Sequence, residues 1–299
     1  MGNIIDVAIP AYNEEESIER TLTSIFTETK LPKDYRIRVT LCLNACTDNT
    51  EKIARDFKNL HPEYDLNVIF ENNKKGKTHA LKKLDNYVDN EIIVFADADI
   101  KPKEDAVFKV YETLLNSPKE IVLASGNAVD PRYLNKNEKP KTLIDSLNRV
   151  FWQRTHRKMV NGPLFATRKG AVQILDEKVV SQDLFLSVYL WEKFVNNFDA
   201  IVIQGSAQSI YEIIRYRRNY QTAYRQMTQY IGDDKERMKI FREAISQFHI
   251  NFRDKNKYWP NISWSHLLLA RLFQNLGRIW GTFSKPTWNK TVSSKNLAE

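Results

Sequence analysis

Two carboxylates two positions apart follow one of the apolar segments of this chain. Residues 92–96 are apolar, and Asp97 and Asp99 come directly after them. Two carboxylates so close together repel each other when no cation is bound. Mg²⁺ and Mn²⁺ prefer carboxylate oxygens, and substrate phosphates complete the ligand set. An isolated D-x-D is common, so a solvated turn after a strand is the other interpretation. Divalent-metal binding is therefore one of two hypotheses for this pair.

A second polar group is rich in lysine and could meet phosphate or carboxylate. Lys74, Lys75 and Lys77 flank one glycine, and the Gly-Lys-Thr triplet at 76–78 resembles the end of a P-loop. Position 71 is Glu, so the glycine that opens that loop is missing and no phosphate cradle is expected. A solvated basic loop is the alternative. The chain also lacks G-x-G-x-x-G and G-x-S-x-G, which argues against a nicotinamide enzyme and against a nucleophile elbow.

A further acid precedes a run with helical character. Asp183 stands immediately before residues 184–190, which are mostly apolar. Asp is favoured at the start of a helix. The same carboxylate could act as a general base, a role that contributes about 10²–10⁴ to a rate. The two roles are compatible.

The first half of the chain predicts a sheet that would bring these groups together. Apolar runs alternate with segments of helical period, and the runs cover 4–9, 37–43, 66–70, 92–95 and 121–124. Short continuous apolar runs are typical of parallel strands buried on both faces. Strands that alternate with helices predict an α/β doubly wound parallel sheet. Helices are expected over 17–26 and from 48–51, where Asp48 and Glu51 fit a capping box.

Polar clusters follow the first four apolar runs. They lie at 11–15, 44–48, 72–77 and 97–99. The carboxyl ends of parallel strands share one edge of an open sheet, and ligands bind there. The four clusters are therefore expected to converge on one binding crevice.

Taken together, the motifs resemble family 2 glycosyltransferases, which have the GT-A fold. The matching segments are VAIPAYNEE at 7–15, NACTDNT at 44–50, GKTHAL at 76–81, DAD at 97–99, NGPLFATR at 161–168 and QDL at 182–184. Any one motif is weak, but six in the expected order are specific, and the resemblance runs from residue 4 to about 232. It implies a GT-A Rossmann-like α/β sheet, mostly parallel and flanked by helices.

The resemblance also implies a role for each matched residue. Asp99 would be the main ligand of Mn²⁺ or Mg²⁺, Asp97 would face the metal or the ribose, and Asp183 would be the general base. The nucleotide, most often a uridine diphosphate, would contact Ala11, Tyr12, Glu14, Asn44, Lys77, Asp97 and Arg218, while Asn161, Gly162 and Gln182 would line the acceptor or donor pocket.

The chain departs from the family pattern at three places. Leu43 stands where the family often has an acid, and Gln182 replaces the usual Glu. The Q-x-x-R-W motif matches only loosely at 215–220, where Arg218 is our first choice for the diphosphate contact.

The implied activity is an inverting glycosyl transfer. A hexosyl or N-acetylhexosaminyl unit would move from a nucleotide-sugar to an acceptor hydroxyl, in polysaccharide or glycolipid biosynthesis. A catalytically silent nucleotide-sugar-binding protein is the alternative. A nucleotidyltransferase would need a glycine-rich loop near the N-terminus, and residues 11–15 contain no glycine.

The C-terminal region differs in composition from the rest of the chain. Residues 233–299 hold 12 Lys and Arg against 6 Asp and Glu, and 4 of the 6 tryptophans. We therefore expect a catalytic domain over 1–232 and a basic, aromatic, helical extension over 233–299. Helical period over 264–280 places Leu268, Leu272, Leu276 and Ile279 on one face. That face could pack on the catalytic domain, form a homodimer, or make peripheral membrane contact through 260–290. No nucleic-acid-binding motif accompanies the charge.

Composition favours a cytoplasmic protein. The two cysteines, Cys42 and Cys46, suggest neither a disulfide framework nor a zinc site. No apolar run approaches the roughly 18 residues that span a bilayer, and the N-terminus lacks the regions of a signal peptide. Peripheral contact with the inner face of the membrane stays open through the C-terminal region.

Overall fold

The chain forms two compact units. The computed structural model describes residues 3–73, 75–130, 138–152, 158–246 and 261–283. One unit comprises Met1–Ala128 with Met159–Gln204, and the other Val129–Lys158 with Gly205–Glu299. The division does not follow the boundary expected at residue 232, because helix α7 (Ile210–Ile231) groups with the C-terminal helix α10 (Trp264–Phe283). Whether 1–232 is an independent catalytic domain stays a prediction.

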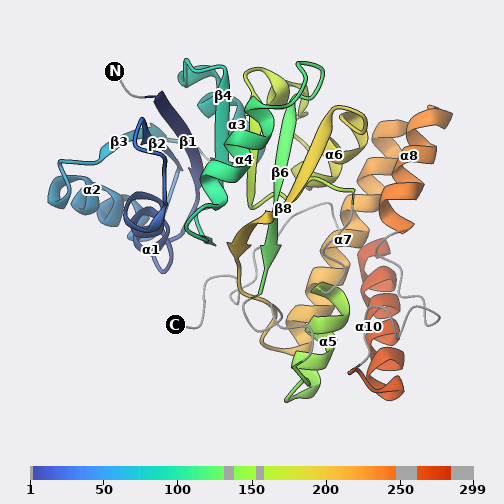
Figure 1. The fold of residues 1–299 in the computed structure, drawn as a ribbon. Helices are drawn as coiled ribbons and strands as arrows, with labels where there is room; N and C mark the ends of the chain where they lie inside the picture. Colours follow the sequence, from blue (N-terminus) through green and yellow to red (C-terminus); the bar gives the residue numbers. More distant parts are fainter. Residues whose placement is uncertain (1–2, 74, 131–137, 153–157, 247–260, 284–299) are drawn as a thin grey trace. The chain divides into compact units, whose positions relative to one another are not determined.

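The first unit is built on an eight-stranded sheet with the order β3-β2-β1-β4-β7-β6-β8-β5. Its first four strands pair in parallel and correspond to the first four apolar runs (Figure 1). They are β1 (Asn3–Ala11), β2 (Tyr35–Asn44), β3 (Asp65–Glu71) and β4 (Ile92–Ala96). This half of the sheet is the expected Rossmann-like arrangement, and it sets the carboxyl ends of four strands along one edge.

The other half of the sheet contains antiparallel pairs. Its strands are β5 (Lys101–Pro102), β6 (Leu123–Val129), β7 (Leu164–Arg168) and β8 (Phe194–Ile203). β7 runs antiparallel to both β4 and β6, and β5 antiparallel to β8. The expectation that the run 121–124 starts a further parallel strand was wrong. Every residue of β6 is buried, and burial on both faces produces an apolar run whatever the direction of the neighbouring strand.

Helices cover this sheet and pack with its strands to form the core. They are α1 (Ile18–Thr23), α2 (Thr50–Leu60), α3 (Lys77–Tyr87), α4 (Ala106–Leu115) and α6 (Gln182–Tyr189), with a π turn η1 (Ser24–Glu28) after α1 and a 3₁₀ turn η3 (Ala171–Ile174). Ile5, Ile9, Leu22 and Leu41 have no exposed surface, and burying such a side chain stabilises a fold by about 1.5–3 kcal/mol.

The expected helix starts are largely confirmed, but one cap differs. The segment 17–26 forms α1 and part of η1. The helix expected from 48–51 begins at Thr50, whose N–H donates to Asp48 Oδ1 at 3.0 Å. Glu51 instead pairs with Arg55 at 2.9 Å. The reciprocal bond of a capping box is therefore replaced by an ion pair along the helix.

The second unit is helical. It contains α5 (Leu143–Trp152), α7, α8 (Lys235–Ser246) and α10. Its core joins Leu147 of α5, Ile213 of α7 and Leu267 of α10, all of them buried. The helical C-terminal region is thus confirmed. Within the parts of the chain that the structure describes, every helix is too short or too polar to cross a membrane.

Candidate active site

The loops that follow β1 and β2 are joined by side-chain hydrogen bonds. Asn13 and Ala45 have φ values of 54° and 56°, a left-handed conformation that is uncommon for residues other than glycine. Asn13 Nδ2 donates to Thr47 Oγ1 at 3.0 Å, and Thr47 N donates back to Asn13 Oδ1 at 2.8 Å. The first two polar clusters therefore meet at the sheet edge, as the sequence predicts.

Glu14 lies inside this junction. Its N–H donates to Thr50 Oγ1 at 2.7 Å, and its carboxylate accepts a hydrogen bond from Ser17 Oγ at 3.1 Å. The residue is 0% exposed. In this conformation Glu14 holds the turn into α1 and has no exposed surface to offer a ligand, so its expected nucleotide contact stays a prediction. Tyr12 is half-buried and Ala11 buried at the end of β1.

Asn44 connects the second cluster to the third. It is buried at the end of β2, and its Oδ1 accepts a hydrogen bond from Lys75 N at 3.2 Å. Lys74 lies outside the described residues. Gly76 has a φ of 88° and immediately precedes α3. This turn lets α3 begin at Lys77, next to the loop that follows β4.

Lys77 is the cation on which three acids act. Its Nζ lies 2.5 Å from Asp97 Oδ1. Burial on its own would lower the pKa of Lys77, but the neighbouring Asp97 outweighs it, helped by the charges of Asp99 and Asp183, and the pKa is raised. The D-x-D pair and the expected base thus lie within electrostatic range of one ammonium.

The end of β4 is held in place by α1. Thr21 Oγ1 lies 2.9 Å from the carbonyl oxygens of both Ala98 and Ile100. Asp99 is buried. Burial lowers the pKa of Arg20, and the negative charge of Asp99 opposes part of this shift. Sequence reasoning missed Arg20 and Thr21. They sit in an ordinary amphipathic helix, and only the packing of α1 brings them to the D-x-D pair.

Asp183 lies in the first turn of α6. Its Oδ1 accepts hydrogen bonds from Leu184 N, at 2.9 Å, and from Ser181 Oγ. The preceding Gln182 donates from Nε2 to Thr78 Oγ1 at 2.9 Å. α6 is thereby attached to the start of α3, one residue beyond Lys77.

The loop 161–163 connects the D-x-D pair to Asp183. Asp97 N donates to Pro163 O at 2.9 Å. A Cβ added to Gly162 would lie 3.4 Å from Asp183 Cβ, so the loop backbone passes directly against this acid. Asn161 N donates to Ser125 Oγ at 2.5 Å, which fixes the loop to β6. The expected acceptor-side loop therefore borders both acidic groups.

Arg218 belongs to the other unit, on α7. Its Nη2 donates to Asn219 Oδ1 at 3.0 Å. The adjacent Arg217 stacks on Phe151 at 3.8 Å from the ring centroid, and burial lowers its pKa. Arg217 therefore has a packing role within its own unit. The diphosphate contact expected of Arg218 stays a prediction.

Comparison with known proteins decides the class of this chain. The model of glycosyl transferase family 2 matches residues 6–174, more than half of the sequence. The chain belongs to this family.

Curated relatives of this family 2 glycosyltransferase match less than half of its length. It is 30% identical over 134 residues to the poly-beta-1,6-N-acetyl-D-glucosamine synthase of Staphylococcus epidermidis, covering 44% of this chain and 30% of the relative. It is 26% identical over 131 residues to glycosyltransferase AglE of Haloferax volcanii, covering 44% and 41%. The matched segment thus spans less than half the length of these relatives.

Solved structures of low sequence identity share the fold. The mannosyltransferase PcManGT of Pyrobaculum calidifontis, in complex with GDP-Man and Mn²⁺, superposes with a TM-score of 0.62 at 16% identity, covering 94% of this chain and 88% of that one. Residues 1–349 of TarS from S. aureus give a TM-score of 0.51 at 15% identity, covering 94% and 90%. These likenesses confirm the GT-A fold.

The donor atoms of this glycosyltransferase fit a divalent cation. Asp97 and Asp99 supply carboxylate oxygens, the ligands that Mg²⁺ and Mn²⁺ prefer. Across the described ranges, no group of three or more His, Cys, Asp or Glu side chains is placed to hold a metal. Two carboxylates would therefore need the diphosphate and water to complete the ligand set, which is the usual arrangement for Mg²⁺.

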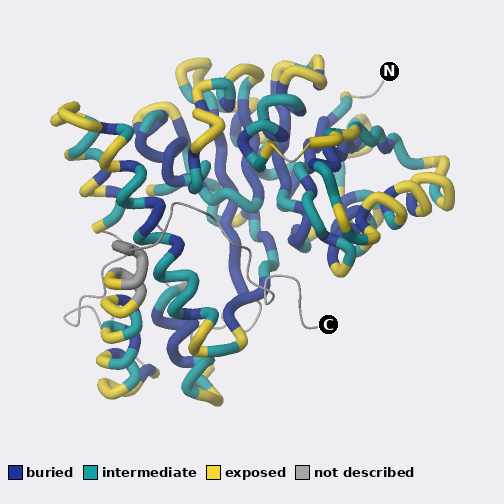
Figure 2. The backbone as a smooth tube through the Cα atoms, turned by 180° about the vertical axis from the view of Figure 1, so that it is seen from behind, coloured by how far each residue is buried: buried dark blue, intermediate teal, exposed yellow. Residues whose placement is uncertain are grey.

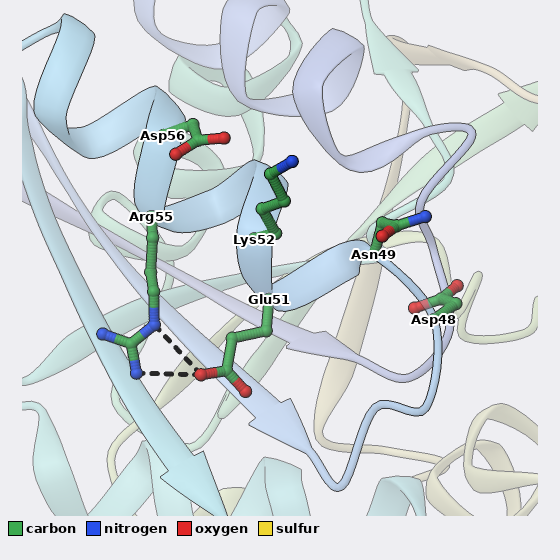
Figure 3. A pocket seen from close by; sticks show the side chains of 6 residues that line it. All are labelled: Asp48, Asn49, Glu51, Lys52, Arg55 and Asp56. Carbon is green, nitrogen blue, oxygen red and sulfur yellow. Dashed lines mark hydrogen bonds and ion pairs between the residues drawn. The ribbon is translucent and has the colours of Figure 1, made fainter.

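A separate hollow lies at the start of α2 (Figure 3). It is lined by Asp48, Asn49, Glu51, Lys52, Arg55 and Asp56. None of the expected site residues lines it. Its side chains carry both charges, and Arg55 is already paired with Glu51, so we assign it no ligand.

Proposed function

We propose that this chain transfers a sugar from a UDP-sugar to an acceptor hydroxyl by a metal-assisted single displacement with inversion. The observation that supports this is that Asp97 contacts Lys77 and that the charges of Asp99 and Asp183 act on the same ammonium in a family 2 glycosyltransferase. A sugar transferase needs charge compensation for its leaving group and a base for its nucleophile. Both kinds of group are available here, close to one lysine.

Asp97 and Asp99 would hold the divalent cation. When bound, such an ion offsets negative charge that develops on the leaving diphosphate. Lys77 and Arg20 add positive charge at the same place, because one contacts Asp97 and the other is influenced by Asp99. Their part is to attract the diphosphate and to hold the two acids in position.

Asp183 would accept the proton of the attacking hydroxyl. Its Oδ1 is oriented by Leu184 N and by Ser181 Oγ, and a negative charge is favourable in the first turn of a helix. The hydroxyl would attack on the face opposite the diphosphate. One displacement inverts the anomeric centre, and no covalent glycosyl-enzyme forms.

The donor base and the acceptor are inferred from relatives. Uracil follows from the family resemblance, with Tyr12 and Asn44 as its contacts, whereas PcManGT was solved with GDP-Man. The names of the relatives include a synthase of an N-acetylglucosamine polymer and an undecaprenyl-phosphate sugar transferase. A glycan or lipid-linked acceptor in polysaccharide or glycolipid biosynthesis is consistent with both.

A donor panel tests the proposal. Release of nucleotide from UDP-Glc, UDP-GlcNAc, UDP-Gal and GDP-Man would be measured with Mn²⁺, with Mg²⁺ and with EDTA. We expect turnover of one UDP-sugar, its loss in EDTA, and a β-linked product by NMR from an α-linked donor. A retained anomeric configuration would rule out the single displacement. Tight nucleotide-sugar binding without transfer to any acceptor would favour the silent binding protein.

A further inference from the structure

Helix α10 exposes a row of large apolar side chains. Leu268, Leu272, Leu276 and Ile279 are between 40% and 60% exposed, and Trp264 at the start of the helix is 57% exposed. In Figure 2 the described part of α10 carries exposed positions beside intermediate and buried ones. Positions three or four apart lie on one face of a helix. These residues, which we call the α10 stripe, therefore form one apolar band about 22 Å long at ~1.5 Å per residue.

The stripe is not the face that anchors α10. Leu267 and Ala270 have no exposed surface, and they pack with Val150 of α5 and Ile213 of α7. The helix is thus held in its unit by one side and presents the stripe on another. Five of the twelve large apolar side chains that are exposed in the described ranges lie on α10. Such a concentration usually marks an interaction surface.

The charge around the stripe indicates what it meets. Residues 255–298 contain seven Lys and Arg and no Asp or Glu, and Arg271 and Arg278 lie within α10 itself. An apolar band that is flanked in the sequence by positive charge matches the interfacial layer of a bilayer that contains anionic lipid. A second copy of this chain would bring two such basic segments together without any acid in them to pair, so charge disfavours self-association through this face.

We propose that α10 lies in the surface layer of an anionic phospholipid bilayer. The stripe is buried at the boundary between headgroups and acyl chains, and the Lys and Arg residues that flank it in the sequence attract lipid phosphates. Part of the segment 260–290 lies outside the described residues, and the proposal rests on the described helix and on the charge of the sequence. It does not depend on sugar transfer.

Vesicle flotation with the full chain tests this. The vesicles would contain phosphatidylcholine alone or with about 30% phosphatidylglycerol. We expect co-flotation with the anionic vesicles, little with the neutral ones, and a decrease as NaCl rises from about 0.1 M to about 0.5 M. The double variant Leu268→Glu/Leu272→Glu should lose at least about tenfold in partitioning, because two charges would enter the apolar layer.

The matched control is Leu60→Glu/Leu115→Glu. These two leucines are also exposed, 75% and 46%, but lie at the ends of α2 and α4 in the other unit. The control should float as the wild type does. Circular dichroism melts would check that both variants fold. If Leu268→Glu/Leu272→Glu does not fold, the milder Leu272→Ser takes its place and should show an intermediate loss of partitioning.

Three results would overturn the proposal. The first is equal flotation of the wild type and the α10 variants, and the second is equal binding of the wild type to neutral and anionic vesicles. The third is a wild type that binds no vesicle but forms a dimer in light scattering, when the α10 double variant does not form that dimer. Because flotation needs no donor or acceptor, these outcomes leave the proposed transferase activity untouched.

Discussion

Lys77 Nζ lies 2.5 Å from Asp97 Oδ1, and this ion pair links the start of α3 to the end of β4. The charges of Asp99 and Asp183 act on the same ammonium. Lys77 is thus an internal cation shared by the metal-binding pair that we propose and by the proposed base.

Replacing Lys77 with Met removes this cation while keeping most of the side-chain length. Mn²⁺ alone should then bind the nucleotide-free protein more tightly, by about fivefold for a lost repulsion of ~1 kcal/mol. UDP should bind more weakly, since a charge that faces the diphosphate is gone. Separate calorimetric titrations with Mn²⁺ and with UDP measure the two effects. Lys83→Met, whose ammonium pairs with Glu71, should change neither affinity, and a parallel fall of both affinities in Lys77→Met would contradict the shared-cation role.

Asp183→Asn should abolish sugar transfer without weakening the binding of the nucleotide. The amide oxygen can still accept from Leu184 N, but the side chain no longer takes up a proton. We expect kcat to fall by about 10²–10⁴ and the Kd for UDP to stay within error. Asp176→Asn, an exposed acid shortly before α6, is the control and should keep its turnover. Near-normal turnover of Asp183→Asn would mean that another group is the base.

Gly162 controls the space beside Asp183. An alanine Cβ there would lie 3.4 Å from Asp183 Cβ, an ordinary contact, so Gly162→Ala should fold and retain most of its activity. Gly162→Leu places a branched side chain against the carboxylate. It should lower kcat by at least about tenfold, because a small displacement of a base is costly, while the Tm changes little. Equal kinetics of the two variants would show that the loop does not position Asp183.

Gly126 has a structural role by contrast. A Cβ added to it would lie 2.9 Å from Ala200 O and 3.2 Å from Leu164 O, both of them backbone atoms that cannot rotate away. Gly126→Ala should therefore destabilise the protein by about 1–3 kcal/mol, as overpacking does. Urea denaturation measures this, with Gly162→Ala as the control. An unchanged urea midpoint would mean that β6 shifts without cost.

Glu71 should make stability depend on pH in the acid range. The hydrogen bond from Lys83, at 2.7 Å, and then the one from Lys75 lower the pKa of Glu71 from 4.5 to about 2. A carboxyl whose pKa is lowered in the folded state stabilises the protein at pH values above its pKa in the unfolded state. This contribution is lost as pH falls from about 4.5 towards 2.

The stability difference between wild type and Glu71→Gln should therefore be largest near neutral pH. It should shrink steadily below about pH 4.5, where the unfolded carboxyl begins to bind its proton. Melting curves at a series of pH values measure it. In a Lys83→Met background the pH dependence should be weaker, and a difference that grows on acidification would have the wrong sign.

Much of the parallel half of the sheet could be predicted from residue pattern. Runs such as 37–43 and 92–95 are continuous and apolar because their strands are buried on both faces. The clusters that follow them fall at one edge because parallel strands end on the same side. The direction of β6 could not be predicted in this way, since β7 joins the sheet between β4 and β6 from much later in the chain.

The sequence by itself determined the family, the order of the polar clusters and the identity of Asp97, Asp99 and Asp183 as residues with suitable chemistry. Only the tertiary structure decided that these acids share Lys77, that Arg20 lies near Asp99, and that Glu14 is buried. It also decided that α10 packs by one face and exposes another. The physical reason is that hydrophobic period and residue type are local properties. Contacts between side chains on separate loops arise only when the helices and strands that carry them pack.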